Sequence, residues 1–170
     1  MTEQTNLNSI WQSFQAFIQP FQSAVLSTLS PQNEPQASYA PVLQQQNAFY
    51  IYISELADHT RNLQQNPKAE LFFIEDESRC ENIFARQRAS IKITAQPIAR
   101  DSEKWRDVMT QFGQLQPEMI PMLRELTDFH LFKLTPYHAR YVKGFAQAFN
   151  LDGEQLKQVA HLNDKGHRKT

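Results

Sequence analysis

Residues 24–54, AVLSTLSPQNEPQASYAPVLQQQNAFYIYIS, decide the fold. Three segments with strand-like composition, 24–30, 36–43 and 48–54, are separated by the polar, turn-forming stretches PQNEP and QQQN. Strand-like runs joined by short turns form hairpins, in which consecutive strands are antiparallel. The stretch therefore predicts a three-stranded antiparallel meander.

The rest of the chain adds strands and helices around this meander. Further strand-like runs lie at 69–74, 88–98, 128–134 and 139–142, the last two joined across Pro136. Apolar residues at helical spacing or capping residues predict helices at 8–18, 56–65, 102–112, 117–126 and 152–161, with a short helical turn at 80–84. Six or seven strands with inserted helices indicate a mainly β protein with helices, a closed or partly closed antiparallel barrel. At 170 residues, one domain spanning 1–170 is expected.

The bulk composition excludes several partners and compartments. A net charge of -1, from 17 basic and 18 acidic residues, argues against nucleic acid as a partner. The one cysteine, Cys80, cannot form an internal disulfide, and residues 1–8 lack a signal-peptide pattern. No apolar run approaches the roughly 18 residues that cross a bilayer. We therefore expect a cytoplasmic protein that does not enter a membrane.

Two familiar kinds of active site are also absent from the sequence. Four glycines, at 113, 144, 153 and 166, leave no Gly-rich loop of the dinucleotide or Walker type. Neither a Gly-x-Ser-x-Gly turn nor a His-Glu-x-x-His helix is present, which argues against a hydrolase. The chemistry must come from other residues.

The C-terminal tail at 161–170, HLNDKGHRKT, holds two of the five histidines, His161 and His167. Such a tail is ordinarily a solvated end, and the spacing of its histidines matches no metal-site pattern. The flanking residues Lys165, Arg168 and Lys169 would equally suit an imidazole aimed at a ligand with an acidic group. The spacing alone leaves both interpretations open.

Other polar residues have an ordinary interpretation beside a functional one. In a strand over 128–134, Asp128 and His130 share one face because successive side chains alternate. A carboxylate at a strand start is typical of a cap or a solvated group. Arg88 is similarly typical of the solvated face of a strand, and His59 lies in the predicted helix at 56–65.

Seven segments taken together resemble one family. They are SYAPV (38–42), HTRNL (59–63), IEDE (74–77), FARQR (84–88), DFHLF (128–132), VKGFA (142–146) and GHRK (166–169). In this order they resemble heme-utilisation proteins of the HutZ/HugZ type, over about residues 22–169. The resemblance implies the split-barrel fold of pyridoxamine-phosphate-oxidase-like flavoproteins, a homodimer, and heme bound between the subunits.

The resemblance also implies residue roles. His167 corresponds to the axial heme ligand and Asp128 to the carboxylate that accepts a hydrogen bond from it. If Asp128 comes from the partner subunit, each site requires a dimer. A ligating imidazole needs such an acceptor for its second N–H. Arg88 corresponds to a basic residue that holds a heme carboxylate or polarises oxygen. His59 is an outside candidate as a ligand.

The implied reaction is oxygen-dependent opening of the porphyrin by ferrous heme, with an external electron donor, releasing iron and a biliverdin-type product. Two alternatives stay open. One is a non-catalytic heme carrier or store, which would have the same ligands. The other is an FMN-dependent oxidoreductase, which needs a cationic phosphate clamp; residues 47–54 hold no Lys or Arg, and Arg61 is the nearest substitute.

Overall fold

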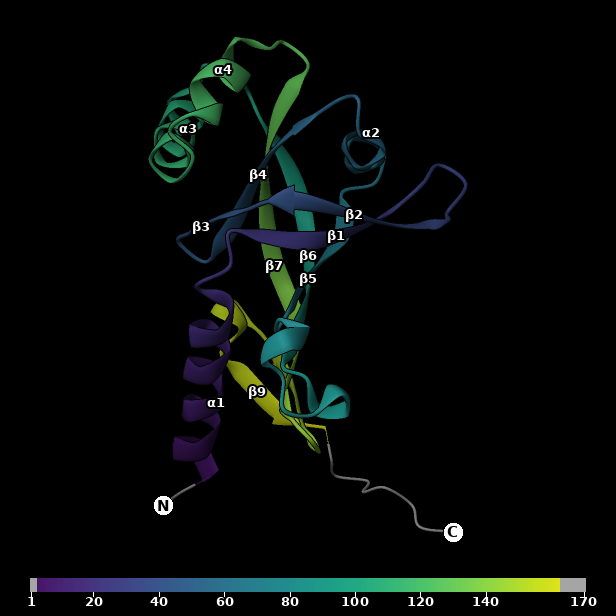
Figure 1. Ribbon diagram of the computed structural model, residues 1–170, viewed down its shortest axis with the longest axis vertical. Helices are drawn as coiled ribbons and strands as arrows, with labels where there is room; N and C mark the ends of the chain where they lie inside the picture. The colour runs from purple at the N-terminus through teal and green to yellow at the C-terminus, as the bar shows by residue number, and fades with distance from the viewer. Residues whose placement is uncertain (1–2, 163–170) are drawn as a thin grey trace.

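The computed structural model describes residues 3–162, with side chains from residue 7 onward (Figure 1). Its strands are β1 (Ser23–Leu29), β2 (Pro35–Pro41), β3 (Leu43–Gln45), β4 (Ala48–Ser54), β5 (Lys68–Ile74), β6 (Arg88–Ile98), β7 (Phe129–Gly144), β8 (Gln147–Asp152) and β9 (Gln158–His161). Its α-helices are α1 (Glu3–Ile18), α2 (Asp58–Gln65), α3 (Glu103–Leu115) and α4 (Met119–Glu125). Three short 3-10 helices complete the described part: η1 (Glu77–Arg79), η2 (Ile83–Ala85) and η3 (Glu154–Leu156).

The strands form one antiparallel sheet that divides at β7. The order is β2-β1-β5-β6-β7-β4-β3, and β8 joins the far half of β7, with β9 beside it. β6 follows one edge of β7 along most of its length. On the other edge, residues 129–134 of β7 pair with β4, and residues 138–144 pair with β8. This divided, sheet-rich architecture confirms the expected fold class, a mainly β split barrel with helices.

The expected meander is only partly correct. β1 and β2 form the first hairpin, but the predicted strand over 36–43 is in fact two strands, β2 and β3. These two strands lie at opposite ends of the strand order, and the chain crosses between them at Val42. The chain therefore connects the two ends of the strand order directly, which the local pattern of alternating residues does not reveal.

β7 replaces two expected strands. The runs expected at 128–134 and 139–142 form one continuous strand, which pairs with β6 on both sides of Pro136. The pairing continues past this proline because the register shifts by one residue between Lys92 and Ile93. Pro136 pairs with Ile93 and His138 with Lys92, so Tyr137 is the extra residue of a bulge. A bulge is one of the few places where a strand accommodates proline.

The helix expected over 152–161 is wrong. The segment contains the end of β8, the single turn η3 and β9. Gly153, Gln155 and Leu156 adopt positive φ angles, which interrupt any regular helix. Cross-strand pairs such as Leu151 with Val159 then satisfy the backbone groups of the segment.

The remaining helices agree better with the sequence. α1 begins at Glu3, earlier than the expected start near residue 8. The sequence pattern misses this first part because it is mostly polar and shows no apolar periodicity. Ser102 caps α3, and its Oγ accepts a hydrogen bond from the Trp105 N–H at 3.2 Å. In the described part, no helix is long and apolar enough to cross a membrane.

Two hydrophobic cores lie on opposite faces of β4. Phe49, Ile51 and Ile53 pack into the larger core, which α1 covers, while Tyr50 and Tyr52 pack into the smaller core under α3. Both faces of β4 are therefore buried, which explains its continuous apolar sequence. Burial on two sides fixes the end of β4, where Ser54 meets the start of β7.

Candidate functional site

Asp128 is held at the junction of β4 and β7. The Ser54 hydroxyl donates a hydrogen bond to Asp128 Oδ2 at 2.7 Å, and the Glu55 N–H donates to the Asp128 carbonyl at 2.8 Å. Asp128 is only partly buried, so part of its carboxylate faces outward. Among the described residues Asp128 Oδ1 has no hydrogen-bond partner. One oxygen is thus fixed, and the other remains to accept a hydrogen bond.

His130 makes a separate contact at the same end of β7. Its Nε2 lies 2.5 Å from Glu55 Oε1, so His130 and Asp128 use two adjacent residues at the end of β4. Nε2 of His130 therefore pairs with the Glu55 carboxylate and not with the carboxylate of Asp128.

His59 belongs to the same end of the molecule. The Thr60 hydroxyl, next to it on α2, donates to the Ser54 carbonyl at 2.5 Å. The His59 ring lies over β2, with Nδ1 2.9 Å from Ser38 Oγ. Since the Ser38 hydroxyl donates its own hydrogen to the Leu26 carbonyl at 3.0 Å, it accepts from His59 Nδ1. Nε2 of the neutral ring is then an acceptor, beside a cavity of about 380 Å³.

Burial lowers the pKa of His59 from its usual 6.5, and the nearby Asp58 carboxylate opposes this change more weakly. A pKa that is lower in the folded than in the unfolded chain means that protonation favours unfolding. The resulting stability is complete above about pH 6.5 and is lost as the pH falls through the unfolded and then the folded pKa. We expect the free energy of unfolding to fall less between pH 8 and pH 5.5 in His59→Gln than in wild type. Equal losses in denaturant titrations would contradict this assignment.

Arg88 lies at the opposite end of the sheet. It begins β6, where it pairs with Ile74 and with Val142 near the end of β7. Its Nη1 donates to the Arg86 carbonyl at 2.7 Å, but within residues 3–162 it forms no ion pair. Its positive charge is therefore available to an anionic group.

Exposed apolar side chains accompany Arg88. Phe84, in η2, is 85 % exposed, and Phe145, just beyond β7, is 67 % exposed. η2 packs against β7, so both phenyl rings belong to the same end of the molecule. Large exposed aromatic residues beside a cation are typical of a surface that another molecule covers.

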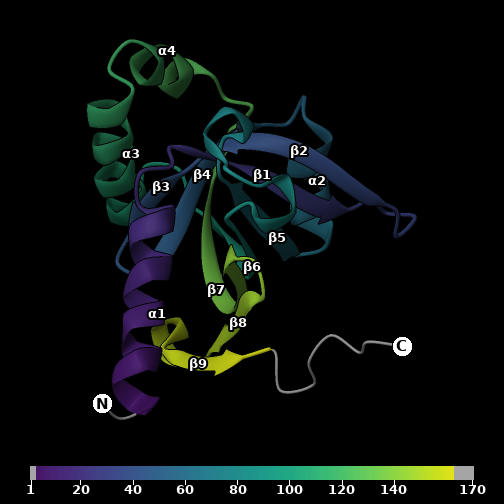
Figure 2. The same cartoon turned by 60° about the horizontal axis from the view of Figure 1, so that its bottom comes forward.

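The candidate residues thus form two groups at the two ends of β7. Asp128 immediately precedes the strand, and Val142, the partner of Arg88, lies fourteen residues farther along. At about 3.3 Å per residue the two positions are separated by about 46 Å of strand. Figures 1 and 2 show β7 running from the α3–α4 end of the molecule toward β8 and β9. One chain does not bring Asp128 and Arg88 together.

His167, the proposed ligand, lies outside the described residues, as do Lys165, Arg168 and Lys169. The last described residue, Leu162, donates from its N–H to the Ala148 carbonyl at 2.8 Å. Ala148 pairs with Val142, so the chain leaves the described part at the Arg88 end.

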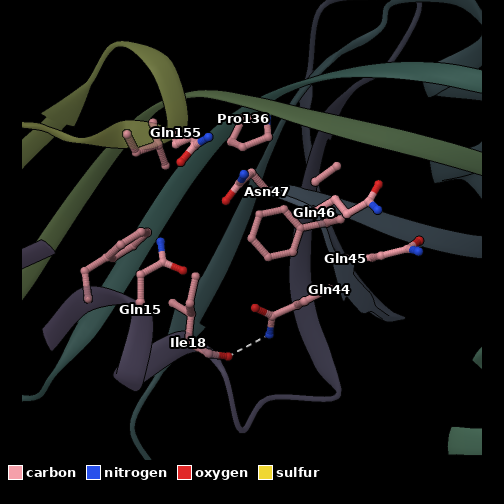
Figure 3. A pocket seen from close by; sticks show the side chains of 12 residues that line it. Gln15, Ile18, Gln44, Gln45, Gln46, Asn47, Pro136 and Gln155 are labelled. Atoms are coloured by element: carbon pink, nitrogen blue, oxygen red, sulfur yellow. Dashed lines mark hydrogen bonds between the residues drawn. The ribbon is translucent and has the colours of Figure 1, made fainter. Parts of the chain in front are cut away.

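A second cavity, of about 190 Å³, lies between α1, the β3–β4 turn and η3 (Figure 3). Amide side chains such as Gln15, Asn47 and Gln155 surround it, and Gln44 Nε2 donates to the Ile18 carbonyl at 2.7 Å. None of the described residues that line it is charged. These lining residues therefore offer no counter-ion to an acidic ligand, and none of them is among the residues expected to be functional.

Arg61 does not form an obvious phosphate clamp. Its guanidinium is exposed on α2 and pairs with the Asp58 carboxylate one turn earlier. In a flavin-binding relative, the strand equivalent to β4 would carry basic residues for the phosphate. Here β4 is buried throughout except at Ser54. The described residues therefore give no specific support to an FMN phosphate site.

Sequence reasoning missed Ser54 and Glu55. Neither belongs to a segment that carries the family resemblance. Ser54 ends an apolar strand and Glu55 follows it, and polar residues at such a position usually mark a turn. The available signal was their position at the end of β4, whose two buried faces hold this end of the strand in place.

Comparisons with known proteins agree with this architecture. Residues 10–143 match the family model described as pyridoxamine 5'-phosphate oxidase. The chain is 40% identical over 153 residues to heme oxygenase HutZ of Vibrio cholerae, covering 90% of this chain and 86% of that protein. The crystal structure of HutZ, there described as a heme storage protein, matches with a TM-score of 0.69 at 38% identity, over 74% of this chain and 88% of HutZ. Campylobacter jejuni ChuZ matches with a TM-score of 0.84 at 31% identity, over 95% of this chain and 66% of ChuZ.

Proposed function

The chain belongs to the pyridoxamine 5'-phosphate oxidase family and, within it, to the HutZ-type heme-utilisation proteins, and from this premise we propose that it binds and degrades heme as a homodimer. His167 is the axial ligand in this proposal, and Asp128 of the other subunit accepts the second N–H of that imidazole. The role is iron acquisition from heme in the cytoplasm.

The observation that carries the proposal is the separation between Asp128, at one end of β7, and Leu162, the last described residue, at the other end. His167 follows Leu162 by five residues, which span at most about 18 Å when fully extended. The path from Val142 to Asp128 is about 46 Å of strand. We therefore assign the Asp128–His167 pair to two chains, and a two-fold arrangement would create two equivalent sites.

The residues present fit a heme. A porphyrin needs apolar contacts for its faces, cations for its propionates, and an imidazole whose second nitrogen has an acceptor. Phe84 and Phe145 offer exposed rings, Arg88 is a cation without an ion pair among the described residues, and Asp128 Oδ1 is an available acceptor. His59 faces its own cavity and is a secondary candidate for heme contact.

The heme would be the substrate as well as the group that activates oxygen. Oxygen and electrons from an external donor open the macrocycle, releasing iron and a biliverdin-type product. The protein's part is to hold the heme and to make His167 a stronger donor through the Asp128 carboxylate. Arg88 would hold a propionate or act on the oxygen side of the heme.

A hemin titration followed by ascorbate under air tests the activity. We expect a saturable Soret band that bleaches with release of iron, and catalase should not abolish the bleaching. A stable band would instead identify a heme carrier, the second candidate, which the description of HutZ as a storage protein favours. Absence of a band, with a yellow flavin absorbance in the purified protein, would contradict heme binding and favour FMN.

A further inference from the structure

We propose that Ser54 is a positioning residue that fixes the Asp128 carboxylate, so that Oδ1 meets the imidazole of the partner subunit. The inference rests on the proposed function, since it concerns the orientation of the carboxylate in that site. It adds a residue that lies outside all segments of the family resemblance.

The hydrogen bonds of the Ser54 hydroxyl direct its proton to Asp128. Ser54 Oγ accepts from the Leu56 N–H at 3.1 Å and donates to Asp128 Oδ2 at 2.7 Å. A hydroxyl has a single hydrogen to donate, so the proton of Ser54 is committed to the carboxylate. Hydrogen bonds to an ionised acceptor are among the stronger ones in proteins.

The Ser54 backbone is itself held from two sides. The Thr60 hydroxyl donates to the Ser54 carbonyl at 2.5 Å, and Ser54 pairs with Phe129 across β4 and β7. The preceding residues of β4 are buried on both faces. The hydroxyl therefore acts from a rigid element, which is what a positioning group requires.

In the described part of the chain, no cation or donor side chain competes for the outward oxygen of Asp128. His130, the nearest histidine in sequence, is occupied by Glu55 at 2.5 Å. Ser54 takes Oδ2, and within residues 3–162 no group takes Oδ1. The arrangement leaves one carboxylate oxygen, at one orientation, for an N–H from outside this chain.

The test compares Ser54→Ala and Ser54→Thr with Asp128→Asn in the heme-loaded protein. The readouts are the iron–histidine stretching frequency in resonance Raman spectra of the ferrous complex and the midpoint potential of the heme. We expect Ser54→Ala to shift the stretching frequency and the midpoint potential in the same direction as Asp128→Asn does, by at least half of the shift that Asp128→Asn causes. Ser54→Thr keeps the hydroxyl and should stay near wild type. Thr110→Ala, which removes an exposed hydroxyl on α3 that donates to the Arg106 carbonyl, is the control.

The double variant Ser54→Ala/Asp128→Asn gives the decisive comparison. If Ser54 acts through Asp128, the double variant has the same frequency and potential as Asp128→Asn alone. Equal shifts from Ser54→Ala in both backgrounds, or no shift in either, would overturn the positioning role. In a crystal structure of heme-free Ser54→Ala, the Asp128 side chain should leave its wild-type rotamer, and an unchanged rotamer would also overturn it.

Failure of the proposed function has a different signature. If Asp128→Asn itself leaves the frequency and potential unchanged, the Asp128–His167 pair is wrong, and the role of Ser54 in it falls too. If Asp128→Asn shifts both and Ser54→Ala shifts neither, the pair stands and only the inference about Ser54 is refuted.

Discussion

Replacing His167 by alanine is expected to raise the dissociation constant for hemin by about 100-fold or more. Groups that only orient a metal ligand typically contribute 10- to 100-fold in affinity, so loss of the ligand itself should reach at least the upper end. The ferric Soret band should broaden and move, because the axial nitrogen is gone. Absorption titration of the purified variant measures both effects.

His161→Ala is the matched control for this variant. His161 is the other histidine near the C-terminus, but its ring packs edge-on against Phe149 in β8, with 4.8 Å between the centroids. Its loss should leave hemin affinity within a few-fold of wild type. An unchanged ferric spectrum and affinity in His167→Ala would remove His167 as the ligand, and a loss in His161→Ala instead would transfer the role to β9.

Replacing Asp128 by asparagine is expected to leave hemin bound but to lower the rate of heme degradation by about 10- to 100-fold. Asparagine has nearly the same shape and still accepts a hydrogen bond, but it lacks the charge that strengthens the imidazole as a donor. The rate of bleaching with ascorbate under air, in the presence of catalase, measures the change.

Asp107→Asn serves as the control for this substitution, because Asp107 is an exposed carboxylate on α3 whose hydrogen bonds include Gln45 and Gln111. We expect its rate and spectra to match wild type. If Asp128→Asn also matches wild type in both, Asp128 is not the orienting carboxylate.

The sequence predicts the fold class because apolar alternation and turn signals are local. β4, β5 and β6 were expected at nearly their observed bounds for this reason. The errors arise where pairing overrides the local pattern. The crossing at Val42 places β2 and β3 on opposite edges, and the positive φ angles at Gly153, Gln155 and Leu156 replace the helix expected over 152–161 with η3 and β9.

The candidate site is less predictable than the fold. The resemblance selects Asp128, Arg88, His59 and His167, but it contains no distances, so it does not show that Asp128 and Arg88 lie at opposite ends of β7. Ser54 becomes visible only through its 2.7 Å hydrogen bond to Asp128. The pairing of β4 with β7 brings these two residues together across 74 residues of chain.

The most direct test of a site shared between subunits is a mixed dimer of His167→Ala and Asp128→Asn chains, isolated with two different affinity tags. If His167 and Asp128 come from different subunits, one of its two sites contains both native residues, because each chain supplies the residue that the other lacks. We predict that this dimer recovers about half of the wild-type degradation rate and a half-stoichiometric native Soret band. A rate no higher than the average of the two parent variants would contradict a heme site built from both chains.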